Sequence, residues 1–208
     1  MTGDHALRNP CPSPHLFVVI EGVDGVGKSS VVRALSARLG ATAYKSPGGP
    51  FALARPLVDE GLDGLTRYYF FRAAVQYDSA CISKLLEQAP VVCDRYIEST
   101  RVCHAIRDPR VWALDAGAAL LKPTRTFVLT AHPDVIARRL LSRPERGHDE
   151  QDLAFILRCD ALFRTLGHPV LDTSTTTADT IADRIVADLE RGDSPKRPDT
   201  HVTSPEST

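Results

Sequence analysis

The fold of this chain is decided by the stretch Gly22-Val23-Asp24-Gly25-Val26-Gly27-Lys28-Ser29, which fits the pattern G-x-x-x-x-G-K-[ST]. The run from residue 15 to 20 before it is apolar and rich in β-branched residues, which predicts a buried strand. Residues 30–39 after it have helical spacing, and Gly40 supplies a stop. Strand, glycine loop and helix in this order are the context that a phosphate-binding P-loop requires.

The residue types of this stretch suit the binding of a triphosphate. Glycines allow a tight turn in which successive backbone N–H groups approach phosphate oxygens closely, and the start of the next helix adds partial positive charge. We expect Lys28 to reach the β- and γ-phosphates of ATP and the Ser29 hydroxyl to ligate Mg²⁺. The predicted phosphate-binding residues are Gly22, Val23, Asp24, Gly25, Val26, Gly27, Lys28, Ser29 and Ser30.

Composition narrows the class of protein. The 208 residues are 43% hydrophobic and 25% charged, which suits one globular domain with a full core. The formal net charge of −1 makes a nucleic-acid polymer an unexpected partner. No apolar run approaches the ~20 residues that span a bilayer, so we expect no membrane partner. Five cysteines without a C-x-x-C pair favour reduced thiols in a cytoplasm.

Strands and helices alternate along the rest of the chain. Strands are expected at residues 15–21, 41–45, 90–94, 126–130 and 169–172. Helices are expected at residues 30–39, 51–61, 65–88, 99–104, 108–121, 132–142, 149–166 and 178–191. This alternation predicts an α/β P-loop kinase fold, a five-stranded parallel sheet with helices on both faces and an arginine-containing lid. Residues 1–14 are expected to be a flexible leader, 15–192 the kinase domain and 193–208 a disordered tail.

Charged residues stand where the predicted strands end, which is where ligands bind in such sheets. Arg95 follows Asp94 at the end of one strand; it is either a clamp for a phosphate on the acceptor or one half of a surface ion pair. Asp94 is either a Mg²⁺ ligand acting through water or an ion-pair partner. Asp24, inside the P-loop, is either a contact to an acceptor hydroxyl or metal-bound water, or a loop-capping residue.

A cluster of arginines flanks Pro144, and it comprises Arg138, Arg139, Arg143 and Arg146. We expect Arg143 and Arg146 to lie in a lid that neutralises the transferred phosphoryl group and excludes water. For Arg138 and Arg139 the pattern favours a solvated helix face. Asp149 and Asp152 open the next helix, as caps or as acceptor contacts. Phe70, on the long helix with Arg72, is either a surface for stacking a base or a core residue.

At this point the chain resembles a thymidylate kinase over roughly residues 15–190. Residues 17–29 are close to that family's opening strand and P-loop, E-G-x-[DE]-G-x-G-K. Pro47-Gly48-Gly49 is similar to the centre of its R-E-P-G-G-T loop, and Asp94-Arg95-Tyr96-Ile97-Glu98-Ser99 matches D-R-[YFH]-x-x-S. Residues 143–152 resemble its lid and the D-R-x-E start of the following helix.

The resemblance implies roles for particular residues. Arg95 would grip the acceptor phosphate, and Asp24 would face the sugar and the metal. Phe70 falls where the family stacks its pyrimidine, and Arg143 and Arg146 would belong to the lid. The resemblance also implies a homodimer that uses ATP and Mg²⁺ and acts on a small nucleotide.

The departures from the family pattern fall in the acceptor pocket. Lys45-Ser46-Pro47-Gly48-Gly49-Pro50 lacks the acid and the threonine of R-E-P-G-G-T. Ala74 stands where the family carries a base-reading arginine, with Arg72 half a turn away. Thr100 and Cys103 replace a polar or small residue and a tyrosine that packs on the deoxyribose. Losing a base-reading hydrogen bond and that ring predicts an acceptor other than dTMP.

Three functions follow from these residues. The first is ATP- and Mg²⁺-dependent phosphoryl transfer to a nucleoside monophosphate, with Lys28, Arg95, Asp24, Arg143 and Arg146 as the catalytic set. The acceptor-binding set is Asp24, Pro47, Phe70, Arg72, Arg95, Thr100, Cys103, Asp149 and Asp152, and the metal set is Ser29 and Asp94. The alternative is a kinase that phosphorylates a hydroxyl group of a nucleoside or of a specialised metabolite, with Glu21 or Asp24 as the base. The second alternative is a nucleotide-binding module without phosphotransfer.

Overall fold

A parallel five-stranded sheet in the order β2-β3-β1-β4-β5 forms the centre of the computed structural model, which describes residues 15–61, 64–114, 120–143 and 152–192. The strands are β1 (Phe17–Glu21), β2 (Thr42–Lys45), β3 (Val91–Asp94), β4 (Arg125–Thr130) and β5 (Val170–Asp172). All five strands lie within about two residues of the ranges expected from the sequence, and the predicted fold class is confirmed.

The P-loop leaves the sheet at its centre. Every residue of β1 is buried, as expected for a strand flanked on both sides and covered on both faces. Ile20 of β1 pairs with Asp94 of β3, and Lys45 of β2 pairs with the same residue. The register therefore brings the ends of β1, β2 and β3 to one edge of the sheet.

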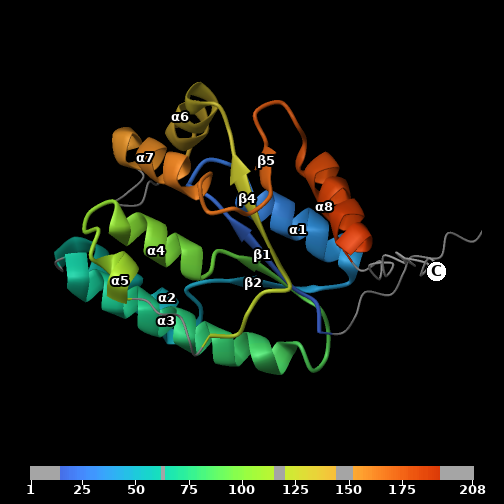
Figure 1. The fold of residues 1–208 in the computed structure, drawn as a ribbon, viewed down its shortest axis with the longest axis horizontal. Helices are drawn as coiled ribbons and strands as arrows, with labels where there is room; N and C mark the ends of the chain where they lie inside the picture. Colours follow the sequence, from blue (N-terminus) through green and yellow to red (C-terminus); the bar gives the residue numbers. More distant parts are fainter. Residues whose placement is uncertain (1–14, 62–63, 115–119, 144–151, 193–208) are drawn as a thin grey trace, which may run out of the picture.

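Helices cover both faces of the sheet (Figure 1). They are α1 (Lys28–Leu39), α2 (Gly49–Gly61), α3 (Gly64–Leu85), α4 (Ile97–Ala105), α5 (Val111–Leu114), α6 (Pro133–Leu141), α7 (Leu153–Phe163) and α8 (Ala178–Gly192). Figure 1 shows α1 and α8 side by side on one face, and α2, α3 and α4 together on the other. Arg38 of α1 bridges Asp183 of α8 at 2.5 Å.

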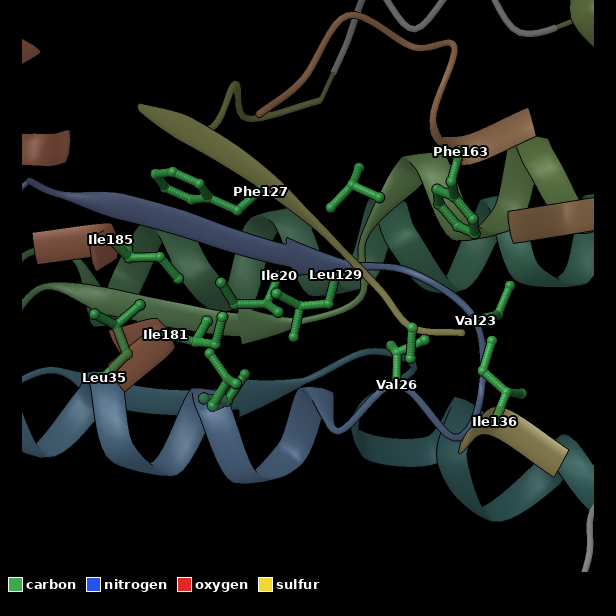
Figure 2. Packing of buried hydrophobic residues seen from close by; sticks show 14 of the residues in the cluster. Ile20, Val23, Val26, Leu35, Phe127, Leu129, Ile136, Phe163, Ile181 and Ile185 are labelled. Carbon is green, nitrogen blue, oxygen red and sulfur yellow. The ribbon is translucent and has the colours of Figure 1, made fainter. Parts of the chain in front are cut away.

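The main hydrophobic core lies between the sheet and the α1–α8 pair (Figure 2). Leu35 of α1 and Ile181 and Ile185 of α8 are fully buried against Ile20 and Leu129. Burying each of these side chains stabilises the fold by about 1.5–3 kcal/mol. The packing fixes α1, and with it the P-loop, against the sheet.

A second part of the core positions the loop itself. Val23 and Val26 of the P-loop are buried in the same cluster as Ile136 of α6 (Figure 2). The two valines occupy variable positions of the motif and act as hydrophobic anchors of the loop. The P-loop is therefore held by side-chain packing as well as by its backbone.

Several predicted helix bounds differ from the structure. The helix expected at 65–88 ends at Leu85, where residues 86–88 continue as a turn. The helix expected at 108–121 is reduced, in the described part, to Val111–Leu114, and Leu120 and Leu121 are not helical. The helix expected at 149–166 runs from Leu153 to Phe163. Residues 1–14 and 193–208, for which a leader and a tail were predicted, lie outside the described residues.

Within the described ranges, none of the helices combines the length and the apolar composition that crossing a membrane requires.

Candidate active site

The P-loop backbone adopts a conformation that only glycine tolerates at three positions. Gly22, Gly25 and Gly27 have φ angles of 130°, 86° and 89°, in the left-handed region. A Cβ on Gly22 would also collide with the backbone carbonyl oxygen of Leu129. The motif glycines are therefore required by backbone geometry before any ligand is considered. Ser30, the last of the predicted phosphate-binding residues, lies in the first turn of α1.

Lys28 begins α1 and folds back over the loop. Its side chain is only 6% exposed, its Nζ donates to the carbonyl oxygen of Val23 at 2.7 Å, and it lies 3.9 Å from Asp24 Oδ1. Burial, and then the nearby charge of Arg95, lowers the pKa of Lys28 to about 8. The ammonium group thus lies against the P-loop itself, beside Val23 O and Asp24, on the loop where a P-loop lysine binds phosphate.

Ser29 and Asp94 form an oxygen-rich pair across the end of the sheet. The Ser29 hydroxyl donates to Asp94 Oδ2 at 2.7 Å. Asp94 is 4% exposed, and its Oδ1 is buried without a hydrogen-bond partner among the described residues. An orphaned carboxylate oxygen beside a hydroxyl is a donor set that suits Mg²⁺, directly or through water. The two residues predicted for the metal therefore fit that group.

Arg95 is held in an unusual backbone conformation opposite the P-loop. Among the described residues it is the one non-glycine with positive φ, at 72°. Its guanidinium donates to Asp24 Oδ1 at 2.5 Å, and to Gly22 O and Ser99 Oγ at 3.1 Å each. Burial would raise the pKa of Asp24, but the positive charges of Arg95 and Lys28 hold it well below its usual range. Asp24 is therefore a firmly ionised partner of Arg95.

Glu21 organises the segment that carries Arg95. Its buried carboxylate accepts from Ser99 Oγ at 2.5 Å, Tyr96 N at 2.8 Å and Ser99 N at 3.2 Å. Burial raises the pKa of this carboxyl group despite those bonds. Both carboxylate oxygens are thus engaged in fixing the start of α4 beside β1.

A cavity opens next to the P-loop, and several predicted acceptor residues line it. They are Asp24, Pro47, Arg95, Thr100 and Cys103. The cavity also contacts Ala74 and Val75 of α3 and Phe155 and Ile156 of α7. Its walls therefore come from six parts of the chain: the P-loop, the segment after β2, α2, α3, the segment that runs from Arg95 into α4, and α7.

Two predicted acceptor residues of α3 do not line this cavity. Phe70 packs edge-on against Phe51 and Phe71, with ring centroids 5.4 Å apart in each case, and Arg72 donates to Gln76 at 3.4 Å. Phe71 lines the cavity instead. Helical spacing explains the difference, because residues 67, 71, 74 and 75 share one face of α3. For contact with the acceptor, the structure favours Phe71 over Phe70.

Asp152 serves a local structural purpose. It is the N-cap of α7, where its carboxylate accepts from Phe155 N at 2.9 Å, and it does not line the cavity. The capping interpretation is therefore favoured over acceptor binding for this residue. Arg143 is exposed just after α6, and its charge contributes to lowering the pKa of Asp24. Arg146 and Asp149 lie outside the described residues.

Several polar residues of the cavity were not predicted from the sequence, among them Arg55, Arg67 and His104. Asp59 joins the two arginines, at 3.2 Å from Arg55 Nε and 2.9 Å from Arg67 Nη2. His104 is 6% exposed, and its Nδ1 lies 2.7 Å from the carbonyl oxygen of Thr100. The spacing of Thr100, Cys103 and His104 on one face of α4 was a signal that could have identified the histidine.

Arg139 is also more than a residue of a solvated face. Its guanidinium donates to Gly25 O at 3.2 Å, to Thr173 Oγ1 at 3.1 Å and to Thr173 O at 2.8 Å. It thereby joins the P-loop, α6 and the segment after β5. The prediction of a purely solvated role for Arg139 is wrong, because it rested on one helix and not on what packs against it.

Fold and site together define a P-loop kinase of the nucleoside monophosphate kinase class. A family model described as thymidylate kinase matches residues 20–166, and the chain belongs to the thymidylate kinase family. The resemblance stated from the motifs is thereby confirmed.

Individual relatives cover most of the chain. A probable thymidylate kinase of Caldivirga maquilingensis is 25% identical over 85% of this chain and 96% of its own length. A thymidylate kinase of Cereibacter sphaeroides is 35% identical over 77% of this chain and 88% of its own length. The solved structure of thymidylate kinase from Candida albicans matches the fold with a TM-score of 0.67 at 20% identity, covering 84% and 91% of the two chains.

Proposed function

We propose that this protein transfers the γ-phosphoryl group of ATP to the phosphate of a nucleoside monophosphate, with Mg²⁺. The observation that carries the proposal is the placement of Arg95, which lines the acceptor cavity and contacts both Asp24 and Gly22 of the P-loop. A guanidinium there can hold an acceptor phosphate next to the triphosphate, because its planar fork matches phosphate oxygens.

The reaction requires little proton chemistry. An anionic oxygen of the acceptor phosphate forms a bond to the γ-phosphorus, the bond to the β–γ bridging oxygen breaks, and ADP leaves with that oxygen. Catalysis is then mostly positioning and neutralisation of charge, supplied by Lys28, Arg95 and, in the lid, Arg143 and Arg146. Asp24 orients Arg95 from the P-loop side.

Ser29 and Asp94 are the residues that would hold Mg²⁺. When bound, the ion neutralises charge on the β- and γ-phosphates. Its support in this chain is the Ser29–Asp94 contact together with the unpartnered Asp94 Oδ1.

The contacts of the two acids disfavour the alternative of a kinase that acts on a hydroxyl group. Such a reaction needs a base to take the hydroxyl proton. Both oxygens of Glu21 are occupied by donors from Tyr96 and Ser99. Asp24 is ion-paired with Arg95, and its low pKa makes it a weak base.

We propose further that dTMP is not the preferred acceptor. Ala74, which stands where the family pattern carries a base-reading arginine, is a buried, apolar member of the cavity wall, and so is its neighbour Val75. Arg67, one helical turn before Phe71, is the candidate to replace it. Cys103 leaves space beside the sugar where the pattern has a tyrosine. The solved Candida albicans kinase is itself described as having a broad substrate specificity.

Coupled release of ADP tests the proposal. The panel contains dTMP, dUMP, UMP, CMP, AMP and GMP, each beside its unphosphorylated nucleoside. We expect turnover with a monophosphate, without turnover of its nucleoside, and a kcat/KM for dTMP below that of another member. Turnover of nucleosides alone would contradict the proposal. A Cys103→Tyr variant is expected to reduce activity on ribonucleotides more than on deoxyribonucleotides.

The cytoplasm is the proposed compartment. Its support is the composition of the sequence, which has five cysteines and no C-x-x-C pair.

A further inference from the structure

The segment that follows β2 forms one wall of the acceptor cavity, through Ser46 and Pro47. It begins where β2 pairs with β3, since Lys45 lies opposite Asp94 and Ser46 N donates to Asp94 O at 3.1 Å. α3 contributes Phe71, Ala74 and Val75 to the wall of the same cavity. The way in which this segment is placed on α3 therefore shapes the cavity.

A single buried carboxylate joins the two walls. Asp78 of α3 is fully buried and accepts three hydrogen bonds: one from Tyr44 Oη of β2 at 2.7 Å, and two from the segment after β2, from Ser46 Oγ at 2.5 Å and Gly48 N at 3.0 Å. Three donors compensate for the cost of burying the charge. Burial, followed by the bond to Asp78, raises the pKa of Tyr44, which keeps its hydroxyl a donor.

The backbone of the segment lies close against its neighbours at this junction. A Cβ on Gly48 would lie 2.9 Å from Asp78 Oδ1 and would collide with the Tyr44 hydroxyl. The neighbouring Gly49 has a φ of 51° and packs on Tyr77, the residue before Asp78. The segment is therefore seated on α3 by backbone contacts as well as by side chains.

Neither Asp78 nor Tyr44 lines the cavity. We infer that Asp78 is a positioning residue, which fixes the Ser46–Pro47 wall against α3 and thereby sets the binding of the acceptor but not of ATP. The inference rests on the proposed function, because it assigns this cavity to the acceptor. It assigns to Asp78 no contact with the substrate.

Steady-state kinetics with the best acceptor of the panel tests the inference. Asp78→Ala is expected to lower kcat/KM for the acceptor at least tenfold, mainly through KM, while KM for ATP changes less than twofold. Tyr44→Phe removes one of the three donors to Asp78 and is expected to lower kcat/KM for the acceptor by a smaller factor. If Asp78→Ala does not fold, Asp78→Asn takes its place, because the amide retains one acceptor oxygen in the same shape.

A double-mutant cycle, which compares the losses in kcat/KM of the two single variants with the loss in the double variant, is the sharper test. Because Tyr44 acts through Asp78, the double variant Asp78→Ala/Tyr44→Phe is expected to be no worse than Asp78→Ala alone. Effects that multiply would overturn the inference. So would an unchanged KM for the acceptor in a folded Asp78→Ala or Asp78→Asn variant.

Ile185→Ala is the matched control for loss of stability. It opens a cavity in the α1–α8 core, far from the acceptor wall, and is expected to leave kcat/KM for the acceptor within twofold. An equal loss in this control would overturn the positioning role. A wild-type protein inactive on every monophosphate contradicts the proposed function, whereas an active wild type with unaffected Asp78 variants contradicts only this inference.

Discussion

Lys28 combines burial with a neighbouring guanidinium, and both keep its pKa low, at about 8. The protonated, phosphate-binding form therefore predominates below that pH and is lost as pH rises through it. We expect the affinity for ADP to weaken about tenfold between about pH 7 and about pH 9, as one proton is taken up with the ligand. Calorimetric titration at each pH measures this dependence.

A Lys28→Arg variant is the control for that titration, because guanidinium does not lose its proton in this range. Its affinity, whatever its value, should be flat with pH. A wild-type affinity that is equally flat would show that Lys28 keeps its proton throughout, contrary to the prediction.

Arg95 donates to three described oxygen partners, Asp24 Oδ1, Gly22 O and Ser99 Oγ, and it lines the cavity, with a side chain that is 16% exposed. Arg95→Lys keeps the charge but loses the planar fork, so we expect kcat/KM for the acceptor to fall roughly 10- to 100-fold. The affinity for ADP should change far less. Initial-rate kinetics with each substrate varied in turn separates the two effects.

Arg110→Lys is the matched comparison for Arg95→Lys. Arg110 pairs with Asp108 at 2.6 Å, but its side chain is 75% exposed. Exposed ion pairs contribute little to the stability of a protein, so we expect the Arg110→Lys variant to keep the activity of the wild type. An equal loss of kcat/KM in Arg95→Lys and Arg110→Lys would contradict a specific role of Arg95 in binding the acceptor.

At the scale of elements, the junction between β1 and α1 is the most constrained part of the fold. Gly22→Ala would place a Cβ against the carbonyl oxygen of Leu129 in β4, at a φ of 130°. We expect this variant to unfold at a lower temperature and to lose nucleotide binding, because the loop must separate from the sheet to accommodate the methyl group. Thermal unfolding with and without ADP measures both effects.

Gly40→Ala is the control that separates the cost of a strained backbone from the cost of the steric collision expected in Gly22→Ala. Gly40 caps α1 with a φ of 58°, and a Cβ there meets nothing within 4 Å. The expected cost is about 1 kcal/mol, with nucleotide binding retained. If Gly22→Ala were no worse than Gly40→Ala, the loop would be less tightly held than its contacts indicate.

At the scale of the whole molecule, α2 and α3 present an exposed apolar surface. Leu53, Leu57 and Tyr69 are 83%, 78% and 55% exposed, and the two leucines lie one turn apart on α2. We propose that this surface is covered in a homodimer, as the resemblance to the family implied. Sedimentation velocity of the wild type should give a dimer, and Leu53→Asp/Leu57→Asp a folded monomer.

Leu141→Asp is the control for that experiment. Leu141 is 69% exposed and is the last residue of α6, a helix that lies away from α2 and α3 in Figure 1. This variant should remain a dimer. A monomeric wild type, or a double variant that remains dimeric, would contradict the assignment of the surface.

The sequence by itself determined the sheet, the P-loop and the Asp94-Arg95 pair. Each depends on local information: an apolar run that suits a buried strand, glycines required by backbone geometry, and charged residues directly after a strand. Local patterns do not report which face of a helix meets a cavity, so Phe70 was chosen where Phe71 lies in the wall. Local sequence patterns also do not show which residues of different helices and strands contact each other.

Tertiary structure alone decided those contacts. Asp59 of α2 forms an ion pair with Arg67 of α3. Arg139 of α6, more than a hundred residues after the P-loop, donates a hydrogen bond to Gly25 O of that loop. Asp78 joins α3 to the segment after β2 in the same way. Each contact exists because a hydrophobic core fixes elements distant in sequence at hydrogen-bonding distance, and that distance is a property of the packed molecule.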